Sequence, residues 1–171
     1  MIGWTIHEVA AACRLTEHEV SAWISRGRFR PSANAQSGQR RLFDWRDLAC
    51  LAVMSALREQ SISMGGIAMI AADLRDGLDR MDAIVARSGL YLYYASDPGT
   101  KRNPTGRLAN TRSLCEILHS RPTTIIVVNV AKIYHDAADA ISSNSSALPQ
   151  KRRPTKRAAF LGRCDGQSRM A

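Results

Sequence analysis

The sequence predicts an α+β chain of four segments. These are a helical N-terminal domain with a basic ribbon (residues 1–72), a connecting amphipathic helix (73–89), a small α/β unit (90–141) and a disordered basic tail (142–171). Three observations predict this order. Two helix-start motifs lie close together near the N-terminus, strand-like apolar runs appear only after residue 89, and the residues after 141 are mostly polar and basic.

Two capping boxes mark the first two helices. Thr5 is followed three residues later by Glu8, and Thr16 by Glu19. In this motif each side chain satisfies a backbone N–H that the start of a helix leaves unpaired. The second helix is expected over residues 17–26, because Gly27 permits the left-handed backbone that ends a helix. The short turn at 13–15 makes the pair a helix-turn-helix unit.

A basic ribbon follows the second helix. Residues 26–31 and 39–43 are rich in arginine, and a polar tip at 32–38 separates them. Pro31 and Gly38 punctuate this stretch as two short strands joined by a turn. The form is that of a wing beside a helix-turn-helix.

The order of these features resembles the DNA-binding domain of MerR-family regulators. That domain has a capped helix, a second helix ending in glycine, a wing closing on Arg-x-aromatic, here residues 41–43, and a helix pair, here starting at 44–48 and continuing through 61–67. The resemblance covers about the first 45% of the chain. It implies a winged helix-turn-helix that binds double-stranded DNA. The family's arginine early in the second helix, which holds the DNA backbone, is replaced here by Ser21.

Candidate DNA contacts lie in the second helix and the wing. The N-terminal end of a recognition helix meets base edges, where His18 and Ser21 donate or accept and Glu17 accepts from a cytosine amino group. Trp23 either packs in the core or, as the resemblance implies, touches the DNA backbone. The wing arginines suit phosphate or the minor groove, with a solvated basic face as the alternative. The full predicted set is Thr16, Glu17, His18, Ser21, Ala22, Trp23, Arg26, Arg28, Arg30, Arg40 and Arg41.

The positive charge is concentrated at the two ends of the chain. The net charge is +9. Residues 1–46 hold seven arginines against four acidic residues, a net +3, and residues 142–171 hold seven basic residues against one acidic, a net +6. A basic head attracts phosphate, and a basic polar tail is predicted to be disordered and to raise non-specific attraction for DNA.

No membrane span or secretory signal is expected, because the sequence has no run of 18 apolar residues and no basic-then-apolar N-terminus. We therefore expect a cytoplasmic protein, associated with the bacterial nucleoid when bound to DNA. The four cysteines are scattered without a Cys-x-x-Cys pair, which argues against a zinc ribbon or a disulfide framework.

The connecting helix is expected to continue to about Arg87. Its apolar residues alternate in steps of four and three, which is the spacing of a coiled-coil seam. The resemblance implies a dimer contact here, and the alternative is an amphipathic helix packing on its own domain. The seam residues are Ile67, Ala71, Leu74, Leu78, Met81 and Val85.

Residues 90–141 are predicted as strand, helix, strand, helix with a parallel strand pair. The strands are expected at 90–95 and 123–130, and the helices at 111–120 and 131–141. The second strand is apolar throughout, as in strands buried on both faces. So small a unit could hardly bury it alone, which favours pairing with a second copy. The loop at 97–107 is either a ligand or backbone contact or a solvated loop.

No enzyme is predicted, because no nucleophile–base string, paired-carboxylate motif, P-loop or dinucleotide fingerprint occurs. Cys115 with His119, and His135 with Asp139, share helix faces, but neither pair has a third ligand nearby, so no metal or cofactor is expected.

Three functional hypotheses remain open. The first is a sequence-specific DNA-binding regulator acting as a homodimer on a two-fold-related site. The second is an excisionase-like or architectural DNA-binding factor of a mobile element. The third is a protein-interaction or assembly module with a vestigial DNA-binding head.

Overall fold

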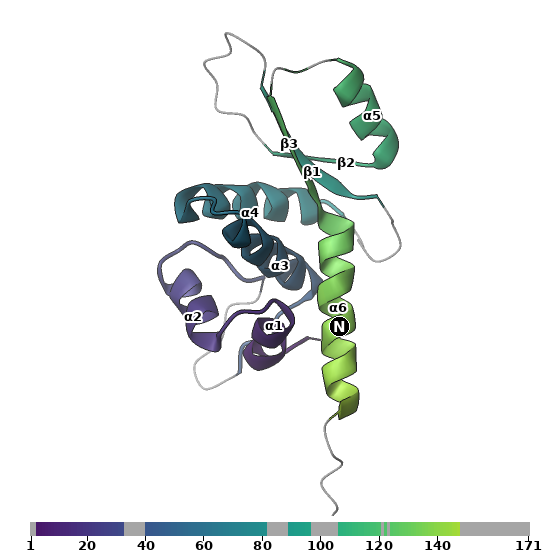
Figure 1. Cartoon of the computed structure of the whole chain (residues 1–171). Coiled ribbons are helices and arrows are strands. Elements are labelled where there is room, and N and C mark those ends of the chain that lie inside the picture. Colours follow the sequence, from purple (N-terminus) through teal and green to yellow (C-terminus); the bar gives the residue numbers. More distant parts are fainter. Residues whose placement is uncertain are drawn as a thin grey trace, which may run out of the picture.

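The computed structural model describes residues 3–32, 40–81, 89–96, 106–120, 122 and 124–147. A group of helices lies at one end and a three-stranded sheet at the other, and the C-terminal helix runs from the sheet along the helical group (Figure 1). The elements are α1 Ile6–Ala12, α2 Glu17–Ser25, α3 Trp45–Glu59, α4 Met64–Leu78, β1 Tyr91–Ser96, β2 Arg107–Ala109, α5 Thr111–His119, β3 Thr124–Asn129 and α6 Val130–Ala147.

Both predicted capping boxes are confirmed. In α1 the backbone N–H of Thr5 donates to Glu8 Oε2 at 2.7 Å, and that of Glu8 donates to Thr5 Oγ1 at 3.3 Å. In α2 the same pair of bonds joins Thr16 and Glu19 at 2.8 and 3.2 Å. Gly27 has φ +66°, the left-handed backbone that glycine favours after a helix end.

The helix pair also forms as predicted. Asp44 caps α3 and Ser63 caps α4. Helix α3 is the centre of the helical group, since its long apolar side chains from Leu48 to Leu57 are buried and it packs against α1, α4 and α6.

The structure corrects the prediction of a dimer seam on the connecting helix. Helix α4 ends at Leu78 and does not continue to Arg87. Four of the seam residues are buried inside their own chain, where α4 packs against α3 and β2. The alternative, a helix packed on its own domain, therefore describes this segment. The buried residues are Ile67, Ala71, Leu74 and Leu78, while Met81 is half-buried and Val85 lies outside the described residues.

The wing differs from its predicted form where it is described. Residues 26–32 form a turn and irregular backbone. On the second side of the wing, residues 40–43, only Phe43 pairs, through an isolated antiparallel bridge to Trp4 with hydrogen bonds of 2.9 and 2.8 Å. The described part of the wing thus contains no strand ladder. Of the polar tip predicted at 32–38, residues 33–38 lie outside the described residues.

The sheet is antiparallel, which corrects the predicted parallel pair. Its order is β2-β1-β3, and β1 pairs antiparallel with both neighbours. The reason is β2, a three-residue strand between the strand expected at 90–95 and the helix expected at 111–120, where no strand was predicted. One extra strand reverses the chain, so α5 connects β2 to β3, which run parallel to each other on either side of β1, in a split β-α-β arrangement.

Strand β3 is not buried on both faces, contrary to its expected environment. Val128 is buried, but Ile126 and Val127 are 46% and 39% exposed. Consecutive residues of a strand point to opposite faces, so both faces of this strand are open near its middle. No residue of α5 is fully buried, and its Leu118 is 48% exposed.

Helix α6 joins the two ends of the molecule. It begins directly after β3 and packs against α3 and α1 (Figure 1). Its Val130, Tyr134 and Ile141 belong to the same buried cluster as the core of α1 and α3. The predicted boundary at 142 is wrong, because the helix continues to Ala147. Residues 148–171, the rest of the predicted tail, lie outside the described part.

A single aspartate fixes the sheet to α4. Asp73 Oδ2 accepts hydrogen bonds from the Tyr94 hydroxyl at 2.9 Å and from the backbone N–H of Gly106 at 2.8 Å. Gly106 lies so close to the Tyr94 ring that a Cβ there would be 2.4 Å from its hydroxyl oxygen and 3.0 Å from Asp73 Cβ. Only glycine fits without displacing these groups.

We predict that Gly106→Ala lowers the free energy of unfolding by about 1–3 kcal/mol, the usual cost of overpacking. Chemical denaturation measures this loss. The matched control is Gly65→Ala in α4, where a Cβ meets nothing within 4 Å. Alanine is the better helix former, so the control should be neutral or gain up to about 1 kcal/mol. Equal stability changes in both variants would contradict the close approach at Gly106.

Candidate nucleic-acid interface

Helix α2 presents a polar face to solvent. Val20 and Trp23 are buried, whereas Glu17, His18 and Ser21 of the same helix are exposed and Ala22 is half-buried. These are the residues that the sequence places against base edges. Trp23 differs from the other predicted contacts in this helix, because it is only 5% exposed and its side chain belongs to the core. Of the two alternatives for Trp23, this burial favours packing in the core over contact with the DNA backbone.

Glu19 is occupied by structural contacts. It closes the capping box with Thr16 and forms an ion pair with Arg58 of α3, which fixes α2 on α3. The hydrogen bond from the Thr16 backbone is the main cause that lowers the pKa of Glu19, with Arg58 adding to it. Glu8 shows the same lowering through Thr5. Both carboxylates therefore stay ionised at neutral pH and serve the helix starts.

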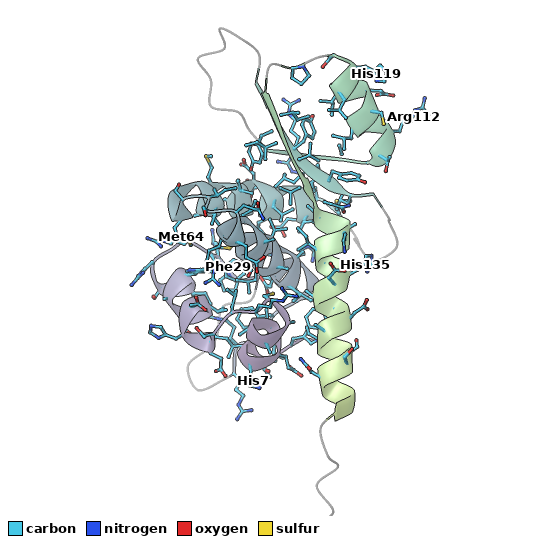
Figure 2. The ribbon with its side chains drawn as sticks, viewed as in Figure 1. His7, Phe29, Met64, Arg112, His119 and His135 are labelled. Carbon is cyan, nitrogen blue, oxygen red and sulfur yellow. The ribbon has the colours of Figure 1, made fainter. Side chains whose placement is uncertain are left out.

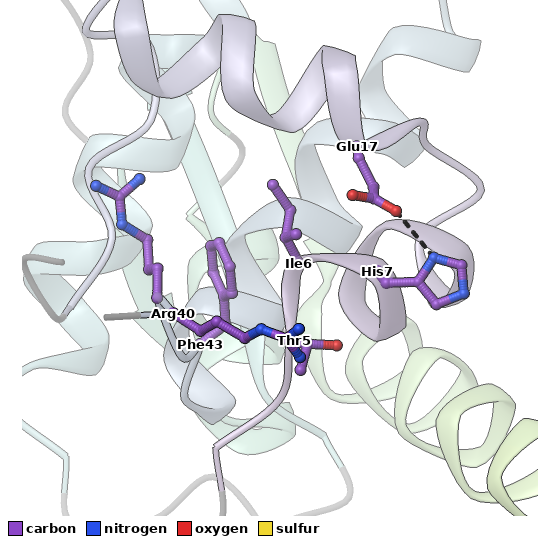
Figure 3. A pocket seen from close by; sticks show the side chains of 7 residues that line it. Thr5, Ile6, His7, Glu17, Arg40 and Phe43 are labelled. Atoms are coloured by element: carbon purple, nitrogen blue, oxygen red, sulfur yellow. Dashed lines mark hydrogen bonds and ion pairs between the residues drawn. The ribbon is translucent and has the colours of Figure 1, made fainter. Parts of the chain in front are cut away.

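A hollow of about 610 Å³ separates the starts of α1 and α2 from the wing (Figure 3). It brings together Glu17 of α2 and the two arginines that close the wing, Arg40 and Arg41. Arg40 is exposed and Arg41 half-buried. The Arg41 Nε is buried without a hydrogen-bond partner in the described part of the chain. The lining residues are Thr5, Ile6, His7, Glu17, Arg40, Arg41 and Phe43.

His7 was not among the predicted contacts, and it projects from the start of α1 at this end of the helical group (Figure 2). Its Nδ1 lies 2.9 Å from Glu17 Oε1, and the two side chains are 80% and 54% exposed. The two residues are ten positions apart, a spacing that no local sequence pattern links.

The remaining predicted arginines lie apart from this hollow. Arg26 caps the C-terminal end of α2 and is exposed, and Arg28 and Arg30 follow it. Arg28 and Arg30 line a second depression with residues of α4. The structure thus separates the predicted set into one group around Glu17, Arg40 and Arg41 and another at the far end of α2.

A buried ion pair, which no sequence pattern indicated, holds the chain that enters the wing. Asp47 is fully buried and pairs with Arg75 of α4. Asp47 Oδ1 also accepts the Ser32 backbone N–H at 2.9 Å, and Arg75 donates to Ser32 Oγ at 2.7 Å and to the Arg30 carbonyl at 3.4 Å. Burial raises the pKa of Asp47, against the opposing effect of Arg75. This pair fixes Ser32, the last described residue before the wing tip.

Nothing in the described residues supports a metal-binding site or a reactive thiol. Burial raises the pKa of Cys13 and of Cys50 to about 12, so both thiols stay protonated at neutral pH. His119 Nδ1 lies 2.7 Å from the Cys115 carbonyl oxygen, which already engages this nitrogen. No cluster of three or more His, Cys, Asp or Glu with metal-binding geometry occurs in the part of the chain described. Among the described helices, none is long and apolar enough to cross a membrane.

Comparison with known proteins agrees with this geometry. Residues 4–74 match the family described as MerR HTH family regulatory protein. The match begins at the Trp4 bridge to the wing and ends at Leu74 in α4, so it contains both capped helices and the hollow. No curated protein matches the chain.

Proposed function

We propose that the protein is a DNA-binding transcription regulator that binds a specific DNA sequence as a homodimer, because residues 4–74 match the MerR HTH family of regulatory proteins. The observation that carries the proposal is the exposed face of α2, with Glu17, His18 and Ser21, beside the arginines of the hollow. Base edges are read by side chains that donate and accept hydrogen bonds, whereas phosphates are held by cations. This end of the molecule offers both.

In the proposed complex α2 enters the major groove, and its exposed side chains contact base edges. Arg40 and Arg41 hold the phosphate backbone beside it, since guanidinium groups are always charged and match phosphate oxygens in shape. Arg26, Arg28 and Arg30 serve the backbone at the other end of α2. Such a protein acts in the cytoplasm, on the nucleoid.

We place the dimer contact on the sheet end of the molecule. The residues of the expected seam on α4 are buried in their own chain, so they offer no surface to a second copy. Strand β3 instead lies at the edge of the described sheet, has no charged residue and exposes Ile126 and Val127. An uncharged apolar edge strand is open to pairing with a strand of another chain. A second copy supplies an identical edge, so antiparallel pairing satisfies both copies about a two-fold axis.

We expect Ile126→Lys with Val127→Lys to convert the dimer to a monomer, because lysine on an edge strand opposes pairing. Sedimentation equilibrium of the full chain measures the change. The control is Leu42→Lys with Met69→Lys, at side chains that are 49% and 48% exposed on the helical domain. A control that dissociates while the β3 variant stays dimeric would place the contact on the helical domain.

The function itself is tested by selecting bound sites from a random DNA library and footprinting the result. A single palindromic footprint supports the regulator. An extended array of tandem sites supports the architectural factor, and no selected sequence or footprint supports the assembly module. Half-site spacing near one helical turn, about 34 Å, or a multiple of it, further supports a two-fold dimer.

A further inference from the structure

The hydrogen-bonded contact between His7 and Glu17 has a position that stability does not explain. His7 is in the first turn of α1 and Glu17 is the first residue of α2, and the pair joins them at 2.9 Å. Both side chains are more than half exposed. Exposed pairs of this kind contribute little to stability. Helices α1 and α2 are already held by their own caps and by buried side chains such as Val9 and Val20.

The pair constrains one oxygen of Glu17 and leaves the other available. A carboxylate only accepts hydrogen bonds, so His7 Nδ1 must carry the proton that it donates to Oε1. In the described part of the chain Oε2 makes no hydrogen bond. Glu17 is thereby held in one orientation at the start of α2, where the proposed recognition helix meets DNA (Figure 3).

A lone carboxylate at a DNA interface is repelled by the phosphates. Here the nearby Arg40 and Arg41 line the same hollow and offset that repulsion. A carboxylate facing the major groove accepts a hydrogen bond from the exocyclic amino group of cytosine. Guanine and thymine offer no such donor on their major-groove edges, and in adenine the N6 amino group lies beside the N7 acceptor, which repels a carboxylate.

We infer that His7 is a positioning residue for base recognition, and that it holds Glu17 so that Oε2 accepts from the N4 amino group of one cytosine in each half-site. This inference rests on the proposed function, since it requires α2 to lie in the major groove. His7 itself touches no base. Its effect is to keep Glu17 in the orientation that reads one.

The test is site selection from a random library with four full-length variants beside the parent protein. The parent should select a cytosine at one half-site position, and Glu17→Gln should lose that preference. His7→Ala should weaken the same preference by about five- to tenfold, within the range of one good base contact, with affinity for random DNA unchanged. His7→Gln, whose amide can donate to Glu17, should restore most of it. His119→Ala, an exposed histidine on α5, should leave the selected site unchanged.

Several outcomes would overturn the inference. Base preference in His7→Ala equal to that of the parent would show that Glu17 needs no positioning. Equal loss of affinity for every sequence would make His7 a phosphate contact. Failure of His7→Gln to restore the preference would exclude the hydrogen bond as its cause. A parent that selects no sequence at all would instead refute the proposed function.

Discussion

Replacing both Arg40 and Arg41 with alanine should weaken DNA binding on the order of a hundredfold, for specific and random sequences alike. Each hydrogen bond to a charged group is worth about 1.5 kcal/mol or more, so two lost phosphate contacts give this factor. Phosphate contacts also release counterions on binding. The slope of log affinity against log salt concentration should therefore fall by about 0.9 for each contact, measured by fluorescence titration at several salt concentrations.

A charge-matched control separates contact from net charge. Arg107→Ala with Arg112→Ala removes the same two charges from exposed positions on β2 and α5. These positions lie at the sheet end, away from the hollow, so the salt slope should stay near that of the parent. An identical slope in both double variants would show that Arg40 and Arg41 act only through net charge. The proposed phosphate contacts would then be wrong.

The parts of the fold that the sequence predicted are those set by local chemistry. Each capping box needs only residues three positions apart, so Thr5 with Glu8 and Thr16 with Glu19 are visible in the sequence and confirmed in the structure. The exposed face of α2 follows from the 3.6-residue period once the helix start is known. The first two helices and the starts of α3 and α4 could therefore be predicted closely, whereas the end of α4 at Leu78 could not.

The sheet shows why the rest could not. Strand β2 is three residues long, too short to give an alternating pattern, and it follows a stretch rich in glycine and proline. Without β2 in the prediction, the strand at 123–130 was expected to run parallel to the strand at 90–95, whereas the two are antiparallel. The predicted dimer seam on α4 was wrong for a different reason. Period alone says that one face is apolar, but not whether that face meets another molecule or α3 of the same chain.

The site residues that were missed depend on contacts far apart in the sequence. Arg75 reaches Asp47 across 28 residues, and Glu17 meets His7 across ten. Neither spacing follows a helical or strand period, so nothing in the local pattern links the partners. Trp23 shows the opposite case. The resemblance suggested a surface role, and the packing of the helical core decided against it.

Removing the charge of Arg75 should give the largest loss of stability. We expect Arg75→Met to lower the free energy of unfolding by about 3–5 kcal/mol, because it leaves the fully buried Asp47 carboxylate without its cation. Urea denaturation at neutral pH measures the loss. The control is Arg80→Met at an exposed position just beyond α4, which should change stability by no more than about 0.5 kcal/mol.

Two further measurements identify the buried carboxylate as the cause. Adding Asp47→Asn to Arg75→Met removes the unpaired charge and should recover much of the stability.

Lowering the pH should also reduce the destabilisation caused by Arg75→Met, because it protonates the Asp47 carboxylate. Burial already raises the folded pKa of Asp47, and without Arg75, which opposes that shift, it rises further. A carboxyl with a raised folded pKa destabilises the fold as pH rises through that pKa, and it carries no penalty below its unfolded pKa of about 4. The difference in stability between parent and variant should therefore shrink as pH falls from 7 towards 4. The loss of the low-pKa caps Glu8 and Glu19 affects both proteins and cancels in that difference. A stability difference that stays constant across this range, with no recovery in the double variant, would mean that Arg75 does not act by neutralising Asp47. Its hydrogen bonds to Ser32 and the Arg30 carbonyl, and its position over the Phe29 ring, would then account for the loss.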